Sequence, residues 1–214
     1  MTFLVTGIIY TLVILYTREK MSNEMHYYKY LGFKKNSYVL ATLIFNQTHY
    51  EIPITDCSLV FGKRDSSIRI TAFLSLHCSH CARAFEKIKD ILKSEADVAI
   101  NVILITSDTK ILNTLYHYNQ LRMDDEALSL LYQWYSMDSY SRAKMSETLC
   151  IIEADDISKG VSNENMELYK SCNVIGTPTF FINGYLLPSQ YEIGDIKYFT
   201  EVFLRKEEIV AGSS

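Results

Sequence analysis

The sequence predicts an α/β fold, in which helices pack on a buried sheet. An apolar, β-prone run over 68–74 leads into residues spaced four, three and four apart between Cys81 and Leu92, which is the period of a helix. A second apolar run over 98–106 is rich in β-branched residues, as expected for a central strand that is buried on both faces. A strand, a helix and a second strand in this order predict a βαβ unit with a right-handed crossover.

The chain begins with an uncharged stretch, residues 3–16, which is followed by Arg18 and Lys20. We expect residues 1–17 to be a hydrophobic, transmembrane segment, although fourteen helical residues span only about 21 Å of a hydrocarbon core of about 30 Å. A cleavable signal peptide, a buried core helix and the tail of a longer membrane protein are the alternatives. Residues 18–66 are then expected to form a connector, with a short packable helix over 37–45.

A two-cysteine motif, Cys78-Ser79-His80-Cys81, lies where the first strand meets its helix. The N-terminus of a helix has unpaired N–H groups and a partial positive charge, both of which stabilise a thiolate. We therefore expect Cys78 to be a nucleophile with a pKa below the free value of about 8.5, and Cys81 to resolve a mixed disulfide. His77, Ser79 and His80 are expected to tune the pair, because an imidazole beside a thiolate favours the reduced form and makes the disulfide a better oxidant.

A metal site is the alternative for the same residues, since two cysteines and two histidines offer four ligands of the kind that zinc binds. Four ligands within five consecutive residues cannot readily surround a tetrahedral ion, and no second C-x-x-C motif is present downstream. We therefore expect thiol-disulfide chemistry, with no metal and no other cofactor.

Composition limits the remaining choices. The 214 residues are 48% hydrophobic and 21% charged, which is enough for one well-buried domain with an appendage. A net charge of −4 without a Lys/Arg cluster argues against a nucleic-acid partner. Five cysteines are too few for a disulfide scaffold. Outside the motif, Cys57 is an unpaired thiol or an auxiliary one that passes electrons, and Cys150 and Cys172 are candidates for a second disulfide.

The second half of the sequence predicts helices and then a hairpin. The apolar spacing from 109 to about 171 is helical, and an acidic triplet at 124–126 is a good helix N-terminus. Within this region the aromatic residues Tyr132, Trp134 and Tyr135 are expected to be core rather than binding surface. Further on, an apolar run over 179–182 ends at Asn183-Gly184, which predicts a two-residue hairpin turn, and a last helix begins near Ile196.

The strand, the C-x-x-C motif and the helix, followed about a hundred residues later by Gly176-Thr177-Pro178 before an apolar run, resemble the thioredoxin superfamily, and the long helical region resembles its DsbA-like members. The resemblance implies a thioredoxin-like domain over 67–205, a helical insertion at about 109–171 and a flexible tail at 206–214. It also implies that Pro178 is a cis-proline packed against the active-site disulfide, and that Gly176, Thr177 and Pro178 bind an extended substrate segment. In one departure, Ala72 stands where thioredoxins have a buried acid.

The hydrophobic start and the ending over 182–199 resemble the thioredoxin-like part of bacterial proteins that fuse a vitamin K epoxide reductase to a redox domain. That resemblance implies a bacterial, membrane-anchored redox domain on the periplasmic, extracytoplasmic side, which exchanges disulfides with cysteine-containing proteins and with a quinone-linked, vitamin K epoxide reductase-like membrane partner. These 214 residues do not include the reductase bundle, so quinone chemistry is not assigned to this chain. A redox-inactive peptide-binding or chaperone module of the same fold is the other alternative.

Overall fold

The computed structural model describes residues 2–55, 58–94, 97–149 and 155–204, and within them a five-stranded sheet has the order β1-β3-β2-β4-β5. The two central strands, β2 (Arg69–Ser75) and β3 (Ala99–Ile105), are parallel, and α3 (Ser79–Ser94) connects them. The other neighbouring strands pair antiparallel, so the sheet is mixed. The βαβ unit predicted from the two apolar runs is confirmed.

The edges of the sheet are a short strand and a hairpin. Strand β1 (Leu59–Gly62) pairs antiparallel with β3, while β4 (Thr179–Ile182) and β5 (Tyr185–Leu186) form the hairpin. The turn residues have positive φ, 47° at Asn183 and 82° at Gly184, which is the conformation that the Asn-Gly pair predicts. A Cβ on Gly184 would lie 2.4 Å from the Tyr50 carbonyl oxygen, so only glycine fits there.

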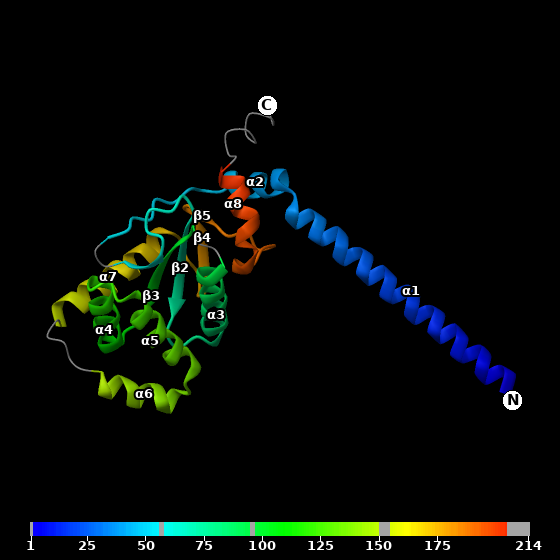
Figure 1. Ribbon diagram of the computed structural model, residues 1–214, viewed down its shortest axis with the longest axis horizontal. Coiled ribbons are helices and arrows are strands. Elements are labelled where there is room, and N and C mark those ends of the chain that lie inside the picture. Colours follow the sequence, from blue (N-terminus) through cyan, green and yellow to red (C-terminus); the bar gives the residue numbers. More distant parts are fainter. Residues whose placement is uncertain (1, 56–57, 95–96, 150–154, 205–214) are drawn as a thin grey trace.

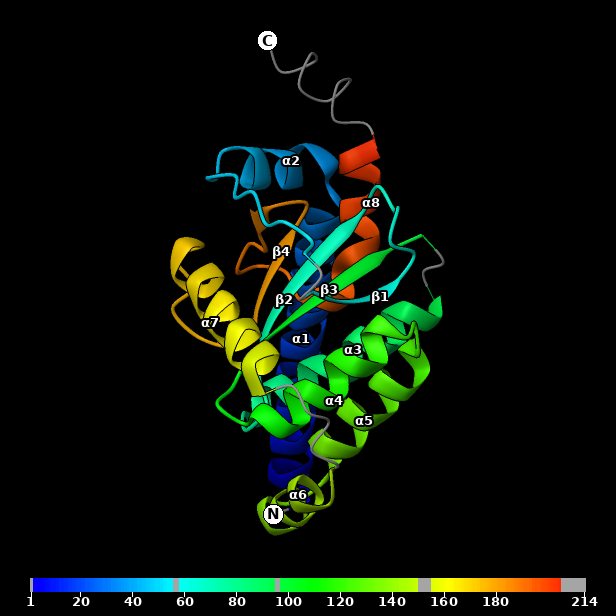
Figure 2. The same cartoon turned by 90° about the vertical axis from the view of Figure 1, so that its left-hand side faces the viewer.

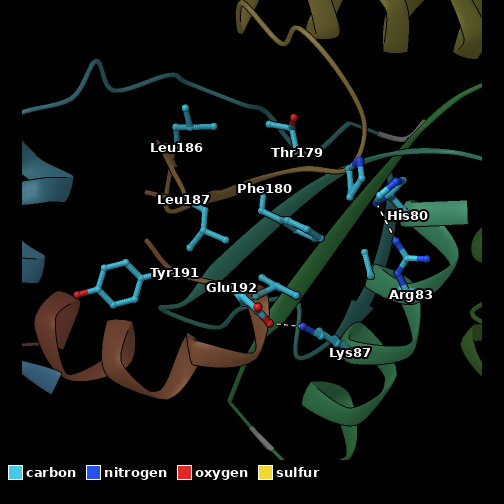
Figure 3. A pocket seen from close by; sticks show the side chains of 12 residues that line it. His80, Arg83, Lys87, Thr179, Phe180, Leu186, Leu187, Tyr191 and Glu192 are labelled. Atoms are coloured by element: carbon cyan, nitrogen blue, oxygen red, sulfur yellow. Dashed lines mark hydrogen bonds and ion pairs between the residues drawn. The ribbon is translucent and has the colours of Figure 1, made fainter. Parts of the chain in front are cut away.

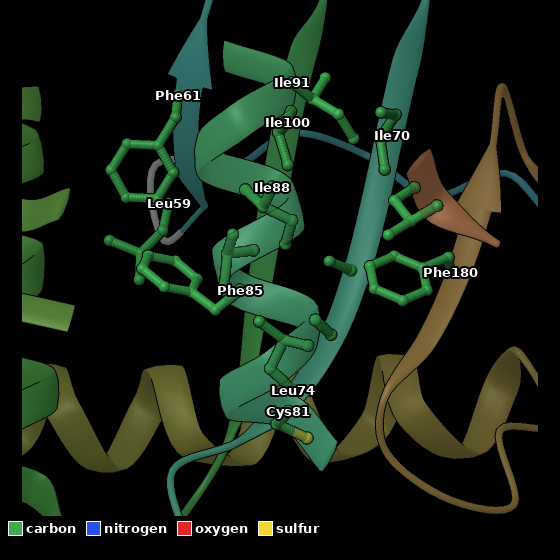
Figure 4. Close-up of a cluster of buried hydrophobic side chains, with 14 of the residues drawn as sticks. Leu59, Phe61, Ile70, Leu74, Cys81, Phe85, Ile88, Ile91, Ile100 and Phe180 are labelled. Carbon is green, nitrogen blue, oxygen red and sulfur yellow. The ribbon is translucent and has the colours of Figure 1, made fainter. Parts of the chain in front are cut away.

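Successive side chains of a strand point to opposite faces of the sheet, which gives the protein two hydrophobic clusters. On one face Ile70, Ala72 and Leu74 join buried side chains of α3, and Figure 4 shows this cluster around the helix. On the other face Phe73 packs with Ile103 and with residues that include Cys172, Val174, Leu168 and Tyr169 from the end of α7 (Asp155–Ser171) onward. The sheet is therefore covered on both faces, as a parallel central pair requires.

The helical insertion expected at 109–171 is present as four helices, with residues 150–154 outside the described part. They are α4 (Thr109–Gln120), α5 (Asp124–Ser136), α6 (Ser139–Thr148) and α7. Helix α5 contacts both α3 and α4, and α4 in turn contacts α7, beside which it lies in Figure 1; Figure 2 shows the same helices turned by 90°. Helix α5 begins at the predicted acidic triplet, and Trp134 and Tyr135 are buried as expected, whereas Tyr132 is exposed.

The N-terminal region differs from the expectation. Helix α1 (Thr2–Lys35) is one continuous helix that projects away from the body of the protein (Figure 1), so no break separates the uncharged stretch from residues 18–35. No helix in the described ranges has the length and apolar character that crossing a membrane requires, and the transmembrane segment expected at 1–17 is thus not found. The reason is that the uncharged run ends at Thr17, before Arg18, Glu19 and Lys20.

The connector expected at 18–66 is largely part of the body. Helix α2 (Ser37–Phe45) buries Leu40, Ala41 and Ile44 in the same cluster as α8 (Ile196–Leu204), and strand β1 belongs to the sheet. The end of α1 is fastened by an ion pair of 2.7 Å between Lys34 and Asp195. The sequence underestimated this region because a four-residue strand and a nine-residue helix carry little periodicity. The tail expected at 206–214 lies outside the described residues.

Candidate dithiol site

The two cysteines of the motif lie at the N-terminus of α3. Strand β2 ends at Ser75, and the backbone carbonyl of Cys78 accepts a hydrogen bond of 3.1 Å from the N–H of Ala82, which makes Cys78 the residue just before the helix. Both are free thiols; Cys78 is half-buried, whereas Cys81 has 0% exposure. Figure 4 shows the Cys81 side chain at the lower end of the core around α3. One sulfur is therefore open to a reaction partner, and the other is enclosed behind it.

The pKa of the Cys78 thiol is lowered from its ordinary value. Burial by itself raises this pKa, but it is outweighed by backbone hydrogen bonds from Cys81 and His80 and by side-chain hydrogen bonds with Cys81 and Thr177. The two backbone donors belong to the first turn of α3, where N–H groups have no partner within the helix. The pattern of strand, motif and helix thus places Cys78 where a thiolate is stabilised, as the sequence predicts.

The Cys81 thiol behaves in the opposite way. Burial raises its pKa to about 11, although the backbone N–H of Ser75, 3.3 Å from the sulfur, donates a hydrogen bond to it. The two pKa values are therefore separated, with the exposed sulfur ionising first. A substrate disulfide would meet the thiolate of Cys78 before that of Cys81.

This separation predicts how the two thiols of the reduced protein react with iodoacetamide at increasing pH. We expect the alkylation midpoint of Cys78 to lie below the free-thiol value of about 8.5, and Cys81 to stay protonated until the pH nears about 11. The lowered pKa of Cys78 stabilises the folded, reduced protein. This stabilisation is present above the pKa that Cys78 has in the unfolded chain, and it is lost as the pH falls through the pKa of Cys78 in the folded protein. For Cys81 it is present below the unfolded pKa and is lost as the pH rises through about 11.

Mass spectrometry of the alkylated peptides measures the two midpoints separately. The control is Cys172, a buried free thiol whose pKa burial raises and which lies away from the helix N-terminus. A Cys78 midpoint at or above that of Cys172 would contradict the prediction.

The segment Gly176-Thr177-Pro178 reaches the first cysteine from the other end of the chain. The Cys78 thiol donates to the Thr177 carbonyl oxygen at an Sγ–O distance of 3.6 Å, and the Thr177–Pro178 peptide bond is cis. Gly176 is exposed, and its carbonyl accepts a hydrogen bond of 2.7 Å from the Thr179 hydroxyl, which begins β4. The structure thus brings together the two motifs that the sequence singled out.

The histidines of the motif are placed differently from one another. The guanidinium of Arg83 donates to Nδ1 of His80 over 2.9 Å, and because Arg has no acceptor, Nδ1 must carry a lone pair in this arrangement. The ring of His80 is thus turned to Arg83, and the contribution of this residue to Cys78 is its backbone N–H. His77 packs edge-to-face on Trp134, with ring centroids 5.9 Å apart, and Ser79 is exposed. The lowered pKa of Cys78 draws on the backbone N–H of His80, and tuning of the pair by the side chains of His77, Ser79 and His80 stays a prediction.

Helix α5 of the insertion holds the loop that carries the motif. The indole N–H of Trp134 donates to the Leu76 carbonyl at 2.9 Å, and the Tyr135 hydroxyl donates to the Ser75 carbonyl at 3.3 Å. Ser75 in turn donates its backbone N–H to the Cys81 sulfur. Two consecutive side chains therefore fix two consecutive carbonyls next to the dithiol, a function that sequence reasoning did not assign to them.

A groove of about 490 Å³ lies beside the cis-proline. One wall is α3, the other is formed by β4 and the segment after β5, and Figure 3 shows the side chains that face it. Its lining combines charged and apolar groups: His80, Arg83, Ala84, Lys87, Pro178, Thr179, Phe180, Leu186, Leu187, Tyr191, Glu192 and Ile193. Most of these residues were not predicted as site residues, because only the fold brings α3 next to a segment about a hundred positions later.

Of the three cysteines outside the motif, the structure describes one. Cys172 is a buried free thiol in the second hydrophobic cluster, and Cys57 and Cys150 lie outside the described residues. In the part of the chain that the structure describes, no group of three or more His, Cys, Asp and Glu side chains is arranged to hold a metal ion.

A half-buried thiol at the start of α3, a second thiol behind it and a cis-proline opposite define the class of thioredoxin-fold dithiol proteins. The chain belongs to the thioredoxin family, since a family model described as thioredoxin matches residues 55–197. No curated protein matches it.

Solved structures share the fold at low sequence identity. Proteus mirabilis ScsC, in a transitional conformation, has 20% identity and a TM-score of 0.57, with 71% of this chain and 74% of that one covered. A periplasmic thioredoxin-like protein from Salmonella enterica serovar Typhimurium has 17% identity and a TM-score of 0.57, covering 77% and 97%. The thiol-disulfide exchange protein alpha-DsbA2 from Wolbachia pipientis has 16% identity and a TM-score of 0.51, covering 80% and 95%. The fold is therefore thioredoxin-like and, among such folds, DsbA-like.

Proposed function

We propose that this protein is a thiol-disulfide oxidoreductase that uses the Cys78–Cys81 pair to oxidise or shuffle disulfides in exported proteins. The observation that carries the proposal is the arrangement of the two sulfurs: Cys78 is half-buried at a helix N-terminus with a lowered pKa and faces the Thr177 carbonyl, and Cys81 is buried behind it. This is the geometry that an attacking and a resolving thiol need.

In the oxidising direction the protein starts with a Cys78–Cys81 disulfide. A substrate thiolate attacks the Cys78 sulfur, the Cys78–Cys81 bond breaks, and Cys81 leaves as a thiolate that takes up a proton because its pKa is about 11. The second substrate thiolate then attacks the substrate sulfur of the mixed disulfide and releases Cys78 as a thiolate. Two electrons pass from the substrate dithiol to the protein, and the lowered pKa of Cys78 makes it a good leaving group.

We assign substrate binding to Gly176, Thr177 and Pro178. The Thr177 carbonyl is directed to the Cys78 sulfur, so a chain bonded to that sulfur would lie along this segment. An extended substrate segment could pair with its backbone in the manner of an added strand. The adjoining groove would then receive the residues next to the substrate cysteine.

The proposal extends to the place and the partner of the reaction. A dithiol that donates disulfides operates in an oxidising compartment, which supports a bacterial, extracytoplasmic location. Helix α1 leaves apolar side chains such as Ile8, Leu12 and Leu15 exposed, which supports a role of this helix in attachment to the membrane. A quinone-linked membrane partner resembling vitamin K epoxide reductase would regenerate the disulfide. Thiol labelling of intact cells that found Cys78 in the cytoplasm would overturn this location.

The equilibrium redox potential of the pair tests the proposed direction. We expect titration of the full chain against glutathione and dithiothreitol to give a potential nearer to the ≈ −120 mV of strong oxidants than to the ≈ −270 mV of thioredoxin, because the thiolate of Cys78 stabilises the reduced form. A potential at the thioredoxin end would make the protein a reductase. Failure of the pair to titrate would support the redox-inactive binding module instead.

A further inference from the structure

The groove beside the cis-proline has an unequal distribution of charge. Two cationic side chains of α3 line it, Arg83 and Lys87, against one acidic side chain, Glu192, and the ring of His80 lies beside Arg83. Lys87 forms an ion pair with Glu192, and Figure 3 shows this pair across the groove. Among the described residues Arg83 forms no ion pair, since its contact is the neutral Nδ1 of His80. The groove is therefore positive at Arg83, in a chain whose net charge is −4.

We propose that Arg83 selects substrates in which an acidic side chain lies close to the reacting cysteine. This inference rests on the proposed function, because it names the class of substrate that the dithiol oxidises. Arg83 is exposed, so its guanidinium can turn from His80 to a carboxylate, to which it can donate two parallel hydrogen bonds.

Helix geometry gives the position of the acidic side chain. Arg83 follows Cys78 by five residues, which is about 7.5 Å along the helix axis. An extended peptide advances about 3.3 Å per residue. The selected side chain thus lies about two residues from the substrate cysteine, on the side that enters the groove.

The walls opposite Arg83 indicate what accompanies the acid. Phe180 and Ile193 are buried apolar side chains, and Leu187 is half-buried next to them. The exposed Leu186 and the half-buried Leu187 offer an apolar surface to the neighbouring side chain of an extended segment, whose side chains alternate in direction. The substrate class is a cysteine-containing extended segment with an apolar residue and an acidic residue beside the cysteine.

The test compares dithiol peptides that react with the pre-oxidised full chain. Three peptides are identical except for Asp, Asn or Lys at the positions two before and two after the first cysteine. In each reaction the peptide dithiol becomes a disulfide and the Cys78–Cys81 disulfide becomes a dithiol, so the second-order rate constant is read in one turnover. We expect the Asp peptide to react about tenfold faster than the Lys peptide at low salt, and the ratio to approach one at about 1 M salt.

Variants identify the residue responsible. Arg83→Glu is expected to invert the order of the Asp and Lys peptides, and Arg83→Gln to bring their ratio near one. Lys89→Gln is the matched control, because it removes the same charge from the same helix at a position where the ammonium lies over the Tyr132 ring outside the groove. The ratio of wild type should persist in this control. Because the ratio is taken within each variant, a change in Cys78 reactivity that affects all peptides equally cancels.

The outcomes separate the inference from the proposed function. If the three peptides react at equal rates, or if Arg83→Gln retains the preference for Asp, the selection by Arg83 is wrong and the oxidoreductase function stands. If none of the peptides is oxidised, both the function and the inference are wrong.

Discussion

Replacing Cys78 with serine is expected to abolish thiol-disulfide exchange. A serine hydroxyl neither forms a mixed disulfide nor ionises in this pH range, so the rate of oxidation of a dithiol peptide should fall by more than about a thousandfold, to the background rate. The measurement is the rate of peptide oxidation with a glutathione redox buffer as the source of disulfide. A redox-inactive binding module would bind unfolded peptides equally well with serine at this position, which makes this substitution the clearest distinction between the two functions.

Two further cysteine variants make the result specific. Cys81→Ser should still form a mixed disulfide through Cys78 but should not resolve it, so the adduct accumulates and can be identified by its mass. Cys172→Ser removes a thiol that is buried in the second hydrophobic cluster, away from the dithiol, and should leave the exchange rate unchanged. Full activity of the Cys78→Ser variant would contradict the proposed mechanism.

Truncation of Trp134 is expected to have the largest effect on stability. Its side chain has 1% exposure, packs against His77 and donates its indole N–H to Leu76. Trp134→Ala removes this packing and leaves a cavity, which should lower the free energy of unfolding by about 3–5 kcal/mol. Urea unfolding followed by far-UV circular dichroism measures the loss, since the protein has a single tryptophan and the variant lacks its fluorescence.

Trp134→Phe separates the hydrogen bond from the packing. It keeps an aromatic ring and leaves the Leu76 carbonyl without its donor, so the free energy of unfolding should fall by about 1–3 kcal/mol, less than in the alanine variant. Tyr132→Ala is the matched control, because Tyr132 is on the same helix but 41% exposed, and its effect should be smaller than that of either variant. A loss of less than about 1 kcal/mol in Trp134→Ala would show that α5 does not anchor the redox loop.

Much of the fold could be predicted because its elements are coded locally. The apolar residues from Cys81 to Leu92 repeat with the period of a helix that is buried on one face. The β-branched run at 98–106 is typical of a strand that is buried on both faces. Helix α3 and strand β3 form at these positions. The Asn-Gly pair encodes its own turn, since it tolerates positive φ. The lowered pKa of Cys78 is local in part, because its backbone donors are only two and three residues away, whereas the side chain of Thr177 comes from the distant segment.

The N-terminal part shows where local pattern is insufficient. An uncharged run predicted a transmembrane segment and a connector, whereas the structure has one helix to Lys35, with Lys34 paired to Asp195 near the other end of the chain. The sequence of an apolar helix does not state whether lipid, protein or neither surrounds it. That depends on which distant residues pack against it.

The site combines both kinds of information. The sequence by itself determined that Cys78 directly precedes a helix and that Cys81 lies in its first turn, because helix formation depends on neighbouring residues. Only the tertiary structure decided that Thr177 faces the Cys78 sulfur, that Trp134 holds the redox loop and that Arg83 lies in a groove with Glu192. These contacts join residues 58 to 109 positions apart in the chain, and they form because the buried apolar faces of the sheet and its helices fix where each element lies, which no local pattern encodes.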